Sequence, residues 1–114
     1  MPVSNNAKRL VIQSIANNIN EMVIGFDGSP STNADGAAGR PAIVISPTVK
    51  VIDDHTILVE GFLPTDYSFN DSLKEVFIQN RTASITTPIA RHTISKITKT
   101  TSNELRIQVI IEVK

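Results

Sequence analysis

Cysteine and tryptophan are both absent from this chain of 114 residues. The lack of thiols excludes disulfide bonds, thiolate metal sites and cysteine nucleophiles. No apolar run reaches the length of about 18 residues that a membrane-spanning helix needs, so the sequence predicts no such span. The first six residues, Met-Pro-Val-Ser-Asn-Asn, lack the basic and then apolar order of a secretory signal peptide, and we expect no sorting signal there.

Neither sign of charge is in excess, because 11 Lys and Arg residues balance 11 Asp and Glu residues. This balance excludes a strongly basic nucleic-acid-binding protein and an acidic tail, and no nucleic-acid partner is expected. Hydrophobic residues make up 40% and charged residues 19% of the chain, which is too apolar a composition for a disordered protein. We expect a single domain that spans residues 1–114.

β-Branched residues are abundant, since Ile, Val and Thr together form about a third of the chain. These side chains fit a pleated sheet better than a helix. Aromatic residues amount to only 4%, so the core is built mainly from Ile and Val. The predicted fold class is α+β and mainly β, with antiparallel sheets or a sandwich and one N-terminal helix.

The helix is predicted at residues 5–18, where Ser4 can cap the first turn. Asparagines at positions 17, 18 and 20 end the pattern, because Asn competes for backbone hydrogen bonds. The residues predicted to form the buried face recur at helical spacing and are Ala7, Leu10, Val11, Ile15 and Ala16.

Alternating apolar and polar residues predict the strands. The segments 48–52 and 56–62 read as a hairpin, and Pro88 is expected to end the strand that begins at Ala83. Irregular spacing in 93–100 predicts a bulge, and the alternation in 105–113 is the clearest in the chain. The predicted strands are 21–26, 42–45, 48–52, 56–62, 73–79, 83–87, 93–100 and 105–113.

A long loop is predicted between the first two strands, at residues 27–41. It holds three of the five glycines, two prolines and many small polar residues, so it cannot contribute a core. Loops of this length in a small domain commonly carry function.

No set of residues has the spacing of a catalytic or metal site. The imidazoles are His55 and His92, and the neighbours of His55 in the sequence are Asp53 and Asp54. Adjacent residues in a turn are expected to point in different directions, so we interpret 53–55 as a solvated turn. No serine lies in a Gly-x-Ser-x-Gly elbow, and residues 36–41 lack the Lys-Ser/Thr ending of a phosphate loop.

Oxygen ligands for calcium at Asp27, Asn33 and Asp35 do not match the spacing of a calcium-binding loop. The sequence therefore predicts a protein that is not an enzyme. It predicts no catalytic residue, no cofactor and no metal.

The order of elements resembles the N-terminal domain of bacteriophage tail-collar and tail-fibre proteins. A helix leads into the segment Ile19–Gly28, and a loop rich in Pro, Asn, Gly and Ala follows. The segments Ile57–Pro64 and Leu73–Gln79 come next, and Leu105–Val113 closes the chain. The resemblance implies a domain that attaches a fibre to the tail or baseplate, commonly as a trimer.

From this resemblance we expect a virion structural protein of the tail or baseplate, made in the host cytoplasm. Its expected partners are other tail, baseplate or fibre proteins and further copies of itself, with a trimer favoured. The alternatives are a capsid decoration or neck protein and a β-rich receptor-binding or carbohydrate-binding module. The residues predicted to contact partners are Met1, Pro2, Val3, Ser4, Gly28, Ser29, Pro30, Asn33, Asp35, Gly36, Arg40 and Phe69.

Overall fold

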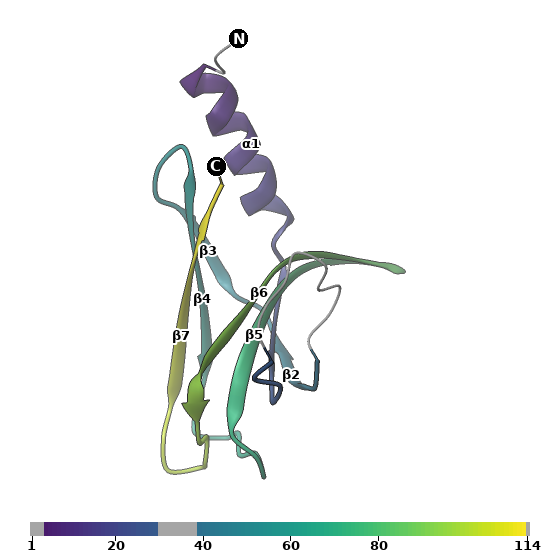
Figure 1. Cartoon of the computed structure of the whole chain (residues 1–114), viewed down its shortest axis with the longest axis vertical. Coiled ribbons are helices and arrows are strands. Elements are labelled where there is room, and N and C mark those ends of the chain that lie inside the picture. Colours follow the sequence, from purple (N-terminus) through teal and green to yellow (C-terminus); the bar gives the residue numbers. More distant parts are fainter. Residues whose placement is uncertain (1–3, 30–38, 114) are drawn as a thin grey trace.

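The computed structural model of the chain describes residues 4–29 and 39–113 (Figure 1). Over these residues one helix precedes seven strands. The helix is α1 (Asn5–Asn18), and the strands are β1 (Glu21–Gly25), β2 (Pro41–Ile45), β3 (Thr48–Val51), β4 (Thr56–Leu63), β5 (Leu73–Thr82), β6 (Ile85–Ile97) and β7 (Leu105–Glu112).

The strands form two antiparallel sheets. Sheet A has the order β2-β1-β5-β6, and sheet B has the order β3-β4-β7. The chain crosses between the sheets at 46–47, 64–72 and 98–104. This arrangement confirms the prediction of a mainly β fold with antiparallel sheets and one N-terminal helix.

The hydrophobic core lies between the two sheets. Sheet A contributes fully buried residues such as Met22 and Ile24, and sheet B contributes Ile57 and Val59. Burial of each such side chain is worth about 1.5–3 kcal/mol relative to exposure. The sheets come close at Gly61, where an added Cβ would lie 2.8 Å from the Cδ1 atom of Ile45.

Helix α1 has the predicted bounds and the predicted cap, since the Ser4 hydroxyl accepts a hydrogen bond from the Ala7 N–H at 3.1 Å. The predicted buried face was wrong in part. The residue that is buried in the helix is Ile12, while Leu10 is 70% and Val11 is 51% exposed. The helix lies against β3 and β4 with Ile12 on the packed face, and its first turns extend beyond the sheets (Figure 1).

Strands β5 and β6 form a long hairpin that curves away from the sandwich, toward the right of Figure 1. We predicted that Pro88 would end a strand and that a separate strand would cover 93–100, and both predictions were wrong. Strand β6 runs through Pro88, and the turn lies at residues 83–84. Among the described residues β6 pairs with β5 alone, and the register shifts between Ile78 and Gln79 opposite the proline, which are the settings in which a strand accommodates a residue without an N–H. A second shift between Leu73 and Glu75 confirms the predicted bulge near the end of β6.

Candidate functional site at the ends of the long loop

A buried carboxylate on β5, Glu75, holds both ends of the long predicted loop. Val76 and Ile78 belong to the core, so Glu75 lies on the opposite face of sheet A. Its side chain is fully buried and accepts three backbone hydrogen bonds, from the N–H groups of Asp27 (2.8 Å), Gly39 (2.8 Å) and Arg40 (2.9 Å). One side chain thereby fixes the points where the loop leaves and rejoins the sheet.

Arg91 on β6 completes this cluster. Its Nε donates to Oε1 of Glu75 at 3.1 Å, the same oxygen that accepts from the Gly39 N–H. The Arg91 side chain is only 4% exposed. Its two terminal nitrogens donate to the carbonyl oxygens of Ser29 (2.9 Å) and Asp27 (3.0 Å). The Asp27 carboxylate lies 3.7 Å from the guanidinium. A buried charge is tolerated only when paired and fully hydrogen-bonded, and this pair satisfies both conditions.

The electrostatics of the cluster favour charged carboxylates. Burial by itself raises the pKa of Glu75, but the backbone N–H groups of Arg40, Asp27 and Gly39 together with Arg91 outweigh burial and hold this pKa below its usual value. The pKa of Asp27 is lowered mainly by hydrogen bonds from the hydroxyl and N–H of Ser29. Both acids are therefore anionic at neutral pH.

Two glycines permit the close approach of backbone to carboxylate. A Cβ on Gly25 would lie 2.5 Å from the carbonyl oxygen of Arg40 and 2.6 Å from a carboxylate oxygen of Glu75. A Cβ on Gly39 would overlap the carboxylate of Asp27. Larger residues at either position would separate the loop ends from the sheet.

The predicted partner-contact residues are placed as follows. Gly28, Ser29 and Arg40 are exposed at the clamped ends of the loop, and Ser4 is exposed as the helix cap. The predictions at 1–3 and at Pro30, Asn33, Asp35 and Gly36 fall outside the described residues.

Phe69 is half-buried and packs against the core. Its ring meets Phe26 edge to face, with a centroid distance of 6.2 Å. The guanidinium of Arg40 lies 5.4 Å from the Phe26 centroid and 3.5 Å from the carboxylate of Asp71. These contacts connect the loop end at Arg40 to the 64–72 segment.

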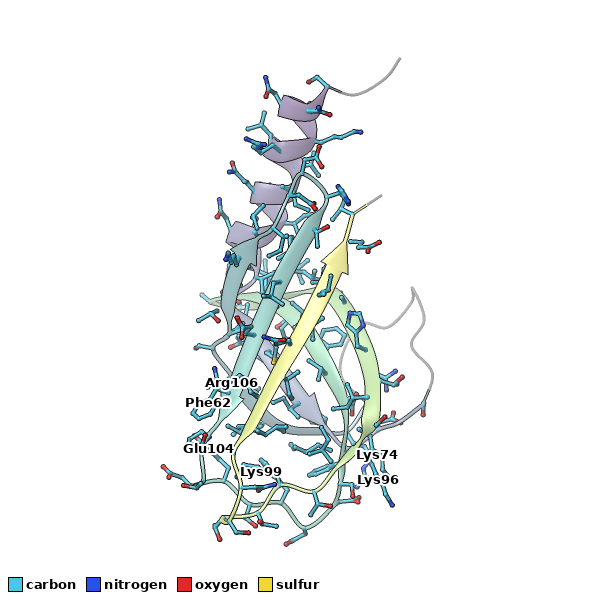
Figure 2. All side chains as sticks on the ribbon, turned by 90° about the vertical axis from the view of Figure 1, so that its left-hand side faces the viewer. Phe62, Lys74, Lys96, Lys99, Glu104 and Arg106 are labelled. Atoms are coloured by element: carbon cyan, nitrogen blue, oxygen red, sulfur yellow. The ribbon has the colours of Figure 1, made fainter. Side chains whose placement is uncertain are left out.

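The end of the molecule remote from the helix carries a further buried charge, Lys99 (Figure 2). Its ammonium group donates to the carbonyl oxygens of Tyr67 and Thr100, both at 2.6 Å. The backbone of Lys99 also accepts from the N–H of Phe69 at 3.1 Å. Lys99 thus ties the 64–72 segment to the turn before β7 and is not available to a ligand.

The turn at 53–55 is solvated as predicted, since Asp53 and His55 are exposed, but the structure corrects the expected directions of its side chains. One ligand atom each from Asp53, Asp54 and His55 lies within 4.8 Å of the others, although we expected these neighbours to point apart. The reason is local, because the His55 N–H donates to Asp53 at 3.0 Å and the ring lies 2.8 Å from Asp54. The hydrogen bond with Asp54 and the charge of Asp53 raise the pKa of His55.

A groove lies between the last turns of α1 and the part of the β5–β6 hairpin nearer its turn. None of the described residues that line it is ionisable, so these side chains offer no acid, base or charged nucleophile. The lining residues are Ser14, Ile15, Asn18, Asn80, Thr87, Pro88 and Ile89.

The Glu75–Arg91 pair was not identified from the sequence. The available signal was an acid within an apolar strand, in phase with Phe77 two residues later. Its partner lies 16 residues away in the sequence, on a strand whose register depends on two shifts, so spacing alone did not connect them.

Among the described residues no helix is long and apolar enough to cross a membrane. Comparisons with protein-family models, curated proteins and solved structures give no match for this chain.

Proposed function

We propose that this protein is a structural subunit of a bacteriophage virion, located in the tail or baseplate, that joins other tail, baseplate or fibre proteins and carries out no reaction. The placement in a virion rests on the order of elements in the sequence. The observation that carries the role in assembly is the apolar surface on parts that extend from the sandwich. Leu10 and Val11 lie exposed on α1, and Ile85 is 62% exposed at the tip of the β5–β6 hairpin.

Such side chains are available to fit a neighbouring subunit, because the core of a protein–protein interface is formed by apolar residues that lose their contact with water. The buried ionisable groups support the same proposal. Glu75, Arg91 and Lys99 are occupied by hydrogen bonds within the chain. These groups hold loops in place and leave no charged side chain directed into the groove beside α1.

Purified phage particles test the location. Mass spectrometry should find the protein at a constant ratio to known particle proteins across a density gradient, and an antibody label should lie on the tail. A label on the head or neck would move the protein to the capsid or neck, and absence from the particles would refute the virion role.

A variant tests the role of the helix. Replacement of both Leu10 and Val11 by Ser changes exposed side chains, so the isolated protein should keep its fold while its incorporation into particles falls. Gln13→Ser is the matched control, since Gln13 is exposed and polar on the same helix. Normal incorporation of the double variant would exclude this face of α1 as an attachment surface.

A further inference from the structure

Strand β7 is the outer strand of sheet B and pairs only with β4 among the described residues. It has eight residues and contains no Pro, Gly or Lys. The other edge strands are protected or short, since β2 begins with Pro41, β6 contains Pro88 and β3 has four residues. Proteins normally protect a long edge strand against pairing with another chain, and of the usual devices β7 carries only its two charged residues, Arg106 and Glu112.

The backbone groups that face this open edge can be identified. The N–H of Val113 donates to the carbonyl oxygen of His55 at 2.8 Å, so the backbone of Val113 points toward the β4 side. Because this direction alternates along an antiparallel strand, the N–H and C=O groups of the even-numbered residues point outward. These residues are Arg106, Gln108, Ile110 and Glu112.

The side chains of odd-numbered and even-numbered residues of β7 lie on opposite faces of sheet B. Ile107 and Val109 are buried in the core, whereas Ile110 is 60% exposed. Arg106 lies on the outer face, where its guanidinium is 5.0 Å from the ring centroid of Phe62 (Figure 2). A strand added to this edge must keep even residues opposite even residues to preserve both faces.

We propose that two copies of this chain associate about a two-fold axis through antiparallel pairing of their β7 strands, centred on Val109. In this register Arg106 lies opposite Glu112 of the partner subunit, and the symmetry repeats that pair. Ile107 lies opposite the partner's Ile111 on the inner face. The two three-stranded sheets then form one continuous sheet of six strands.

Charge selects this register over its neighbours. A pairing centred on Ile110 sets Glu112 opposite the partner's Gln108, and a pairing centred on Gln108 sets Arg106 opposite the partner's Ile110. The register centred on Val109 pairs the acid and the base of β7, and opposite charges that face each other across two strands stabilise the pairing.

This inference deepens the proposed function, because the role of the dimer within an assembly rests on that function. It also replaces the trimer expected from the sequence with a dimer. A two-fold interface uses the same surface on both subunits and closes after two copies. The dimer can be measured on the purified protein, so its failure is distinct from absence of the protein from particles. A monomer that is found in particles would refute the dimer alone.

Cross-linking tests the register. Two residues that face each other at a non-hydrogen-bonded antiparallel pair have Cα atoms about 4.5 Å apart, which is within the range for a disulfide. The chain has no cysteine, so Val109→Cys should give a disulfide-linked dimer on oxidation. Ile107→Cys is the matched control and should stay unlinked, because it faces the partner's Ile111. No linked dimer of the first variant, or equal linking of both, would overturn the register.

Charge reversal tests the contact without a change in the core. Arg106→Glu or Glu112→Arg alone should weaken the dimer by roughly tenfold in sedimentation equilibrium, since each variant sets like charges opposite each other. The double variant should restore the dimer, and Lys96→Glu at an exposed position of β6 should leave it unchanged. A native protein that stays monomeric, or an oligomer indifferent to these reversals, would refute the proposal.

Discussion

At the scale of single residues, Glu75 is a buried group on which four hydrogen bonds converge. It joins two backbone segments and a strand, and its counterion Arg91 is almost as deeply buried. Removal of one member of a buried ion pair leaves the other charge without compensation in a low-dielectric site.

We therefore expect Glu75→Gln to destabilise the protein by about 3–5 kcal/mol in urea unfolding at neutral pH. Glu104→Gln is the matched control, because Glu104 is exposed, and it should change stability by less than about 0.5 kcal/mol. Similar unfolding curves for the two variants would show that the buried pair contributes little.

The same residue sets an acid dependence. The pKa of Glu75 is lower in the folded chain than its ordinary value of 4.5, so the charged form favours the folded state. Its contribution is fully present above pH 4.5 and is lost as the pH falls through the lowered folded pKa. The free energy of unfolding should decline on acidification less steeply in Glu75→Gln than in the native protein.

At the scale of elements, α1 has a packed face and an exposed face. Ile12 is fully buried against the core, whereas Leu10 is exposed. Ile12→Ala should cost about 2–5 kcal/mol in unfolding free energy, and Leu10→Ala should cost less than about 0.5 kcal/mol. A larger cost for Leu10→Ala would mean that the helix packs through the face that the sequence predicts.

The contact between the sheets allows a second comparison. A methyl group at Gly61 would meet the side chains of Met22 and Ile45, whereas one at Gly28 would be 3.3 Å from the flexible chain of Lys74. Gly61→Ala should therefore lower the free energy of unfolding by about 1–3 kcal/mol through overpacking, measured by thermal unfolding. Gly28→Ala should not lower it. A stable Gly61→Ala variant would indicate that the layers can separate locally without cost.

The sequence predicted well the elements whose bounds are set by local features such as caps, turns and apolar spacing. The helix at 5–18, the hairpin of β3 and β4 and the alternating strand β7 all followed from caps, turns and apolar spacing. The buried face of α1 did not, because it depends on which side of the helix lies against β3 and β4.

Tertiary position decided the rest. Pro88 fits inside a strand only because that strand lies at the edge of sheet A, and edge position is a property of the whole sheet. The loop of the candidate site was predicted from its Gly, Pro and Asn content. The groups that hold its ends come from β5 and β6, and no local pattern connects them to the loop.

At the scale of the whole molecule, the candidate surfaces lie apart from one another. The first turns of α1 project at one end and the β5–β6 hairpin extends to the side (Figure 1). The open edge of β7 belongs to the other sheet. A subunit with separate surfaces of this kind can contact several neighbours at once, which suits a component of an assembly.

The order of the strands also determines how the chain can be divided. The segment 64–72 separates β1–β4 from β5–β7, yet each group supplies strands to both sheets. A protease cut in that segment would give two fragments, neither of which holds a complete layer. Each fragment would expose the apolar surface that the other covers, so the fragments should bind each other and rebuild the native fold, and neither should fold alone.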